Sequence, residues 1–358
     1  MALAGVGVVA AAAALCLSGC ANLGYYWQSA SGHLKLMSAA RPVEQWLQDG
    51  EAPEKLKNRL ALSRKIRQYA VRELKLPDNS SYHRYADLRR TAAVWNVVVA
   101  PRYSLTLRRW CFPVTGCVAY RGYFDEAEAR AEAARFSSAY YETSVYPVPA
   151  YSTLGWMNWA GGDPLLNTFI HYPEGELARL IFHELAHQVL YTKNDTTFNE
   201  SFATAVERLG GERWLQTQAS EQAREAYAAF DGRRRMFRQL SRATRERLET
   251  LYETPGMAPE AKAEGKRRIM EDFRAEYERM KAASGIDPLL WRAYDRWVRE
   301  ANNAFFGAQA AYDELVPGFE ALFRSVGGDW PRFYDAARHL ATLPKPERHQ
   351  TLKEAAGG

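Results

Sequence analysis

The stretch ELARLIFHELAHQVLYTKNDTTFNESFATAVERLG, residues 176–210, decides the interpretation of the chain. Apolar residues flank the central HELAH on both sides and predict a buried helix over residues 174–191. A second helix is expected over residues 198–209, closed by Gly210 and Gly211. The loop between them is short, so the second helix can fold back onto the first.

The first of these helices carries His183 and His187, four residues apart and therefore on one face, where both imidazoles can bind the same metal ion. Glu184 lies beside them, where it can hold a metal-bound water and take its proton. Two histidines and a glutamate in a buried helix are costly unless something satisfies their polar groups. The pattern therefore predicts a metal site, and zinc is the expected cofactor.

A catalytic zinc ion has three protein ligands and one open position. We expect the third ligand to be Glu200, which opens the second helix. The sequence Thr197-x-x-Glu200 also matches a capping box, in which Glu200 only caps the backbone. Glu207, seven residues further along the same helix face, is then the alternative ligand, or it supports a ligand histidine.

The N-terminal segment is an apolar run, too short to span a membrane, that leads into Leu17-Ser18-Gly19-Cys20. This ending resembles a bacterial lipobox, which implies a signal peptide over residues 1–19 and a lipid on Cys20. Two acyl chains anchor a protein stably, and the alanine after the cysteine favours the outer membrane by resemblance to lipoprotein sorting. We expect a periplasmic, lipid-anchored protein with residues 20–40 as a short tether; a plain secretory peptide is the alternative.

Cys111 and Cys117 lie six residues apart in WCFPVTGCVAY. In an oxidising periplasm such a pair closes a small turn with a disulfide, and Pro113 and Gly116 bend the chain between the two cysteines. The alternative is half of a metal site, although the spacing is wider than in the usual C-x₂₋₄-C pair and no second pair follows. We expect the disulfide.

The composition is that of a globular protein, with 358 residues of which 47% are apolar and 25% charged. The net charge of +5 gives no reason to expect a nucleic-acid partner. Strand-like segments cover residues 92–107 and 110–124, which suggest a hairpin or meander, and residues 145–156, which prolines confine to a sheet edge. Most other segments have helical patterns, including a long charged hairpin over 218–253 and 258–283.

The fold class is therefore α+β, mainly helical. The expected organisation is a signal peptide (1–19), a tether (20–40), a catalytic region (41–210), a helical domain (211–343) and a polar tail (344–358).

HELAHQ followed by NESFATAVERLG resembles the large zinc aminopeptidases of the gluzincin class, in which these segments supply the zinc ligands. The resemblance implies a zincin-like core with Glu200 as the third ligand and Glu207 as a supporting acid. The Gly-Ala-Met-Glu-Asn signature of those exopeptidases is absent, and GWMNW at residues 155–159 lacks the glutamate. The metal core is therefore implied, while recognition of a free amino terminus is not.

A closer resemblance covers nearly the whole chain. The lipobox, CxxxxxCVxYRGYF, YSTLGW, HELAHQ, FNESFA and NNAxxxxxxxYxxxVPxF together resemble a bacterial lipoprotein family described as putative zinc aminopeptidases. This implies a membrane-anchored zinc metallopeptidase acting on peptides, with aminopeptidase activity expected. A zinc endopeptidase or cell-envelope amidase stays open, as does a non-enzymatic lipoprotein whose zinc is structural or absent and whose hairpin binds a partner.

Zinc peptidases usually need a hydrogen-bond donor for the developing oxyanion. We expect Tyr312 to be this donor, with Tyr191 as the second choice, although the chain has 20 tyrosines and a structural role stays open for both. The segment 151–154 is expected to be a strand that pairs with an extended peptide substrate by edge addition, or else an ordinary sheet edge.

Overall fold

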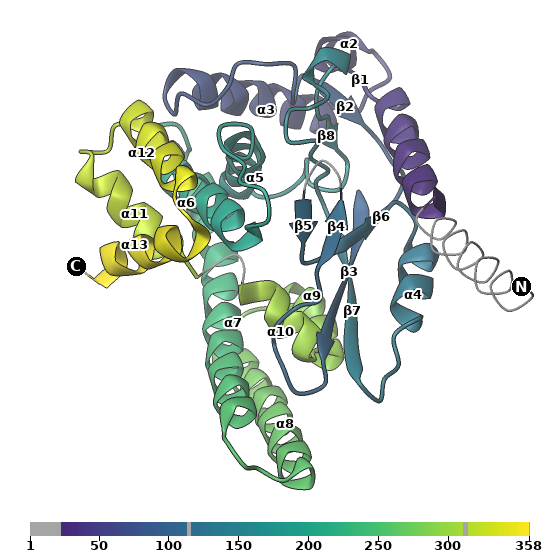
Figure 1. Ribbon diagram of the computed structural model, residues 1–358. Coiled ribbons are helices and arrows are strands. Elements are labelled where there is room, and N and C mark those ends of the chain that lie inside the picture. Colours follow the sequence, from purple (N-terminus) through teal and green to yellow (C-terminus); the bar gives the residue numbers. More distant parts are fainter. Residues whose placement is uncertain (1–22, 113–115, 311–313, 358) are drawn as a thin grey trace, which may run out of the picture.

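The computed structural model describes residues 23–112, 116–310 and 314–357 (Figure 1). It is mainly helical with small mixed sheets, which confirms the expected α+β class. No helix in these ranges is long and apolar enough to span a membrane. After a first helix over residues 23–38, the helices are α2 (Val43–Gln48), α3 (Glu54–Arg72), α4 (Glu126–Ala134), η1 (Asn158–Ala160), α5 (Glu174–Ala186), α6 (Thr196–Thr217), α7 (Glu221–Glu253), α8 (Pro259–Ala283), η2 (Pro288–Trp291), α9 (Arg292–Glu300), α10 (Asn303–Ala310), α11 (Val316–Ser325), α12 (Trp330–Thr342) and α13 (Lys345–Gly357).

The strands of the described residues are β1 (Arg41–Pro42), β2 (Arg84–Ala86), β3 (Val94–Pro101), β4 (Trp110–Phe112), β5 (Gly116–Val118), β6 (Arg121–Tyr123), β7 (Tyr141–Val148) and β8 (Leu165–Leu166). They form two three-stranded sheets and one two-stranded ribbon. In the longest pairing, β7 runs antiparallel to β3 with Val94 opposite Val148, and β7 lies at the edge of the order β6-β3-β7. An edge strand tolerates the missing N–H of Pro147, as expected from the prolines of this segment. The second sheet has the order β1-β2-β8, and β4 pairs with β5.

Residues 23–38, expected to belong to a tether, form a helix that packs on the protein (Figure 1). Leu36 is buried in the main core. Gly32 lies so close to Phe124 that a Cβ would meet the ring at 2.2 Å. The Gln28 side chain donates to the Gly122 carbonyl and accepts from the N–H of Phe124. The tether expectation is therefore wrong for this segment, because one face of the helix is packed against the body.

Helices α5 and α6 make the most extensive contact between elements in the described chain. Gly210 and Gly211 lie inside α6 at tight contacts, since a Cβ on Gly210 would meet the Leu74 side chain at 2.6 Å and one on Gly211 would meet the Arg179 side chain at 2.4 Å. These glycines permit close packing and do not form a C-cap. The expectation that they end the helix at residue 209 is wrong, because α6 continues to Thr217.

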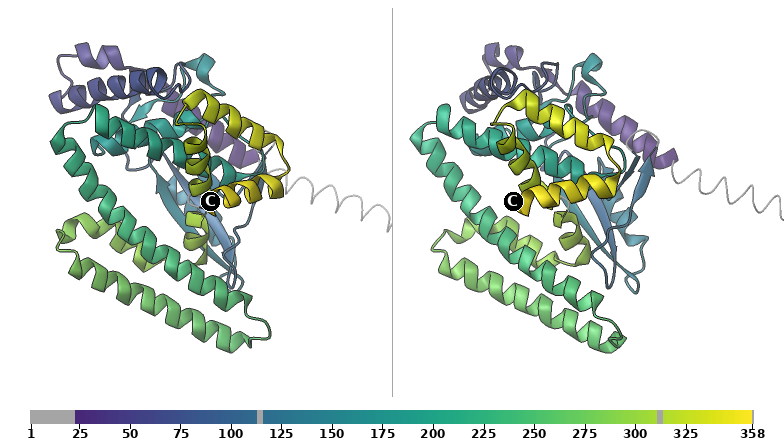
Figure 2. Two further views of the ribbon diagram at one scale, coloured as in Figure 1. Left: turned by 90° about the vertical axis from the view of Figure 1, so that its left-hand side faces the viewer. Right: turned by 60° about the vertical axis from the view of Figure 1, so that its left-hand side comes forward.

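The main hydrophobic core joins segments that the sequence assigned to different domains. It includes Leu36 of the first helix, Phe182 of α5 and Phe319 of α11. A second core around Trp291 joins the α7–α8 hairpin to α9 and α10, and the hairpin projects from the body of the molecule (Figure 2). The segment 211–343 therefore divides between the two cores, because α11 and α12 belong to the main body.

The polar tail expected at residues 344–358 is instead occupied by helix α13, which packs along α11. Its residue Leu352 is only 1% exposed. His349 Nε2 lies 2.9 Å from the carboxylate of Asp195, the buried residue that caps α6. Burial alone raises the pKa of Asp195, but the hydrogen bond and charge of His349 outweigh it and lower the pKa. The C-terminal helix thus holds the start of α6.

Gly318→Ala is expected to destabilise the protein by about 1–3 kcal/mol, because overpacking forces backbone shifts. A Cβ at this position in α11 would meet the Leu352 carbonyl oxygen of α13 at 2.2 Å. Gly232→Ala in α7 is the matched control: no atom lies within 4 Å of its new Cβ, so alanine should stabilise the helix by roughly 0.5–1 kcal/mol. Chemical denaturation measures both, and equal stabilities would contradict tight packing of α13 at Gly318.

Candidate metal centre

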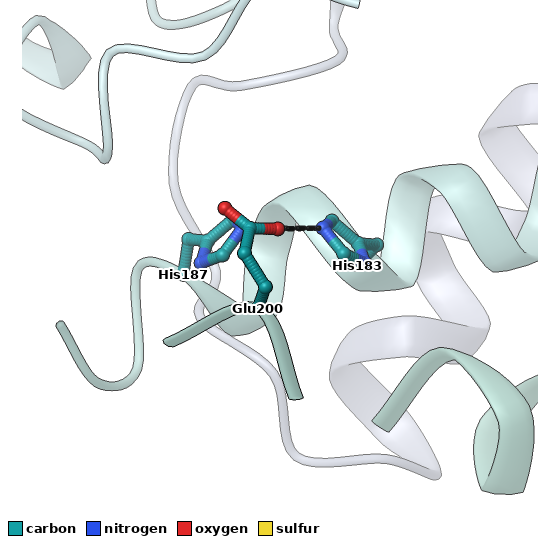
Figure 3. Close-up of side chains that lie close together, drawn as sticks. All are labelled: His183, His187 and Glu200. Carbon is teal, nitrogen blue, oxygen red and sulfur yellow. Dashed lines mark hydrogen bonds and ion pairs between the residues drawn. The ribbon is translucent and has the colours of Figure 1, made fainter. Parts of the chain in front are cut away.

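His183, His187 and Glu200 bring three potential ligand atoms together (Figure 3). The two imidazole Nε2 atoms are 3.2 Å apart, and Glu200 Oε2 lies 3.3 Å from that of His183 and 3.7 Å from that of His187. Two ligand atoms bound at about 2.0–2.1 Å in a tetrahedral site are separated by about 3.3–3.4 Å. The three atoms therefore already have the spacing of a tetrahedral metal site.

The cluster is buried, with side-chain exposures of 13% for His183, 6% for His187 and 12% for Glu200. Burial alone raises the pKa of Glu200, but the charge of His187 and the hydrogen bond with His183 outweigh it and hold the pKa below its usual range. Two imidazole nitrogens and a carboxylate oxygen that face one another away from water match the donor set of a bound divalent metal ion.

The chain is fixed where it leaves α5. The helix ends at Ala186, earlier than the expected residue 191, and His187 follows as its C-cap. The next side chain, Gln188, accepts hydrogen bonds from the amides of Asn79 at 2.7 Å and Asn158 at 3.1 Å. These contacts hold the end of α5, and with it His187, in a defined position.

The loop after α5 directs Glu200 back onto the two histidines. The carboxylate of Asp195 accepts from the N–H of Phe198 and caps α6. The Asn199 side chain closes the loop, accepting from the Thr192 N–H at 2.7 Å and donating to its carbonyl at 2.8 Å. Because α6 begins at residue 196, Glu200 lies in its second turn, and the capping-box alternative is wrong.

Glu207 lies on the other side of the His183 ring. Its Oε2 is 2.9 Å from His183 Nδ1, while His183 Nε2 faces Glu200. Burial alone raises the pKa of Glu207, but the charge of Arg179 and the contact with His183 outweigh it and lower the pKa to about 2. A carboxylate at Nδ1 fixes the tautomer and orientation of an imidazole that binds metal through Nε2. This geometry matches a supporting acid and not a third ligand.

Sequence reasoning missed Arg179, one helical turn before His183 in α5. Its side chain is 5% exposed and contacts Glu207 of α6 and both Tyr227 and Asp231 of α7. The network therefore connects the imidazole to the helical hairpin. The available signal was an arginine four residues before a candidate ligand within an apolar helix, where a charge needs a partner.

Glu184 lines a cavity beside the cluster. Its carboxylate makes no hydrogen bond or ion pair with other residues in the described ranges. Its charge acts on Asp163, whose pKa is raised to about 6 mainly by burial. Glu184 therefore keeps its oxygen lone pairs available, unlike Glu200 and Glu207, and can accept a proton from a water molecule in the cavity.

The cavity has a volume of about 510 Å³ and is lined by segments far apart in sequence. Tyr120 and Tyr191 both line it, and burial together with the charge of Glu200 raises the pKa of both. Sequence reasoning missed Tyr120, because nothing in a short strand region pointed to the metal site. Tyr312, the expected oxyanion donor, and Cys20, the expected lipid site, lie outside the described residues.

The segment 151–154, expected to be a strand, is not one in the structure. Strand β7 ends at Val148, and the N–H of Thr153 donates to both oxygens of the buried Asp163 carboxylate at 3.0 Å. Leu154 then has a φ of +55°, a left-handed conformation that turns the chain. The strand expectation is therefore wrong, although the segment still lines the cavity.

A disulfide between Cys111 and Cys117 closes the ribbon β4–β5. Asn194, in the loop between α5 and α6, accepts from the N–H of Cys117 at 2.7 Å. Arg109 donates to the carbonyls of both Cys117 and Asn194, and Phe112 of the ribbon lines the cavity. The ribbon is thus attached to the loop that carries the metal-site residues.

Residues 24–352 match the family described as "Putative aminopeptidase". The chain belongs to this putative aminopeptidase family. The match begins in the first helix and ends in α13, so the putative aminopeptidase unit includes both terminal helices. No curated protein and no solved structure matches the chain significantly. Membership of the putative aminopeptidase family supports a peptidase-like, hydrolytic function.

Arg179→Met is expected to lower the free energy of unfolding by about 3–5 kcal/mol, because it leaves the buried Glu207 carboxylate without its cation. Arg235→Met is the matched control: Arg235 contacts the same network through Asp231, but its side chain is 71% exposed, and its loss should change stability by less than about 0.5 kcal/mol. Urea denaturation measures both. A loss of stability for Arg179→Met as small as that for Arg235→Met would show that the buried arginine is dispensable.

Proposed function

We propose that this protein is a zinc metallopeptidase with aminopeptidase activity, anchored on the periplasmic side of a membrane by a lipid on Cys20. The observation that carries the proposal is the convergence of His183 Nε2, His187 Nε2 and Glu200 Oε2 beside the carboxylate of Glu184, which has no hydrogen-bond or ion-pair partner among the described residues. Two imidazoles and one carboxylate with an open fourth position are the donor set of catalytic zinc in metallopeptidases. The family match supports the peptidase part of the proposal.

A zinc ion held by these three side chains supplies a Lewis acid that polarises the scissile carbonyl and makes water more acidic. Glu184 accepts the proton of the attacking water and returns it to the leaving nitrogen. The carboxylate of Glu207 lies 2.9 Å from Nδ1 of His183 and favours the tautomer with its proton on Nδ1, so that the Nε2 lone pair faces the site. In this proposal His183, His187 and Glu200 bind the metal, and Glu184 transfers the proton.

The developing oxyanion needs a hydrogen-bond donor. Tyr120 is a suitable candidate, because it lines the cavity and interacts electrostatically with both Glu200 and Glu184. Tyr191 also lines the cavity and interacts with Glu200. Tyr312 remains the candidate from the sequence. Replacing each of the three by Phe and comparing kcat identifies the donor, which is the residue whose loss lowers kcat most.

One observation favours a second function, the cleavage of internal peptide bonds. The described residues that line the cavity include two carboxylates, Glu184 and Glu200, and both have roles in the metal chemistry. Recognition of a free amino terminus calls for a further carboxylate, and the described lining offers none. Acetylating the amino terminus of a model peptide separates the functions, because an aminopeptidase loses this substrate and an endopeptidase retains it.

Glu184→Gln is expected to keep about one zinc ion per chain and to lower kcat by about 10²–10⁴-fold, because it removes the base and leaves the three ligands. Glu200→Ala should lose both zinc and activity, since two imidazoles remain. Metal analysis and peptide hydrolysis measure these outcomes. Glu212→Gln is the matched control, because Glu212 lies exposed on α6 and contacts only Gln216 among the described residues.

Three results would contradict parts of the proposal. Tight zinc binding that survives Glu200→Ala but not Glu207→Ala would make Glu207 the ligand. Stoichiometric zinc without hydrolysis of any peptide would indicate a structural zinc in a non-enzymatic lipoprotein. Absence of zinc from the purified wild-type protein, together with no gain on adding it, would exclude the metal centre itself.

A further inference from the structure

The cavity beside the metal-site residues is walled mainly by aromatic and aliphatic side chains. They come from the first helix, the disulfide ribbon, β6 and its continuation, and the segment after β7. No lysine or arginine of the described chain lines the cavity. Its aromatic lining residues include Tyr25, Phe112, Tyr120, Phe124 and Tyr151.

Contacts between these rings hold the wall in place. Tyr25 stacks on Phe112 with ring centroids 5.5 Å apart, and the guanidinium of Arg121 lies 3.9 Å from the centroid of the Tyr25 ring. Phe124 packs against Tyr151 with a centroid distance of 5.1 Å. Because the side chains of this wall are already ordered, an apolar group that binds there leaves water without the entropy cost of ordering the cavity.

We propose that this cavity binds a large apolar side chain of the substrate next to the bond that is cleaved, an inference that rests on the proposed peptidase function. Its volume of about 510 Å³ falls within the roughly 300–1,000 Å³ of pockets that hold small organic ligands. An acidic side chain would lose its hydration there and find no lysine or arginine of the described chain in the lining. Phenylalanine, leucine or methionine is therefore preferred at this substrate position.

Two neighbouring residues of the first helix provide a matched test. Tyr26 lines the cavity and is 44% exposed, whereas Trp27 is 74% exposed and is not part of the lining. Peptides X-Ala-Ala-Ala with a free amino terminus and acetyl-Ala-Ala-X-Ala-Ala, with X as Phe, Lys or Glu, serve as substrates, so that X lies next to a cleavable bond for an aminopeptidase and for an endopeptidase. The wild-type protein should favour Phe over Glu by about 10–100-fold in kcat/KM. Tyr26→Asp should lower the Phe-to-Lys ratio by about 3–5-fold, and Trp27→Asp should leave it unchanged.

Binding of the same peptides to Glu184→Gln protein, measured by calorimetry, separates this inference from the proposed function. Preferential binding of the Phe peptide without turnover by the wild type would support the apolar pocket and overturn the peptidase proposal. Turnover or binding that does not distinguish Phe from Glu would overturn the pocket proposal while the peptidase function stands. An equal loss of Phe preference in Tyr26→Asp and Trp27→Asp would also overturn it.

The outer face of the first helix carries a separate feature. Leu23, Trp27 and Leu34 are 68%, 74% and 66% exposed, and their spacing places them in one stripe along the helix. Tyr25 and Ser29, which line the cavity, lie on the far side of the helix from this stripe, and Tyr26 lies between the two faces, because a helix has 3.6 residues per turn. It begins three residues after Cys20, and residues 23–43 contain a lysine and an arginine but no acidic residue.

We infer that this stripe lies in the headgroup region of the membrane, beside the lipid that the proposed function places on Cys20. Tryptophan and leucine are suited to that region, and the absence of acidic residues avoids repulsion from anionic lipids. The same helix would then hold the cavity next to the membrane surface, since its other face contributes Tyr25 and Ser29 to the lining.

The test uses chains that begin at residue 20, with Cys20 or with Cys20→Ser, and vesicles of phosphatidylethanolamine and phosphatidylglycerol. Trp27→Asp should weaken vesicle binding of the Cys20→Ser chain by about tenfold. Leu289→Asp is the matched control, because Leu289 is also an exposed apolar residue, at 58%, and lies in η2, far from the first helix in the sequence. Brominated lipids should quench the wild-type fluorescence more than that of Trp27→Phe, which keeps an apolar side chain.

The outcomes distinguish the stripe from the anchor. Vesicle binding that depends on Trp27 in a protein without lipid on Cys20, as judged by mass spectrometry of the cell-derived chain, would support the stripe and overturn the anchor. A lipidated protein in which Trp27 is not quenched, and whose Cys20→Ser chain does not bind vesicles, would support the anchor and overturn the stripe.

Discussion

The close contact between α5 and α6 is the constraint on which the functional site depends. Gly210 and Gly211 carry no Cβ, so α6 packs closely against Arg179 and Phe182 of α5. Glu200 and Glu207, two turns apart on one face of α6, then reach opposite nitrogens of the His183 ring. A single imidazole is thereby oriented from both sides, and its Nε2 is left facing His187.

These two carboxylates are similarly buried but differ in what neutralises them. Glu207 contacts the guanidinium of Arg179, whose charge is permanent. Glu200 is paired only with the two histidines among its described contacts, and imidazoles that bind a metal are neutral. A buried carboxylate without a permanent cation is costly, which makes Glu200 the better candidate for a metal ligand.

The sequence was sufficient to predict features that depend on neighbouring residues alone. The spacing of His183 and His187 follows from helix geometry alone, and the charged hairpin of α7 and α8 follows from its pattern. It was insufficient where the same local signal has two meanings. Gly210 and Gly211 match the pattern of a helix C-cap, but in the structure they allow close packing inside α6. Residues 23–38 carry apolar side chains on both faces of the helix, so the sequence does not show which face is buried. Only the tertiary contacts decide such cases.

The loop between α5 and α6 shows why the site needs nearly the whole chain. Gln188 at its start is held by the segment around Asn79, Asn194 by the disulfide ribbon, and Asp195 by His349 of α13. Each contact crosses at least 70 positions of sequence, and each fixes a residue between the histidines and Glu200. The position of the third candidate ligand is therefore a property of the assembled fold, which agrees with a family match that extends from residue 24 to residue 352.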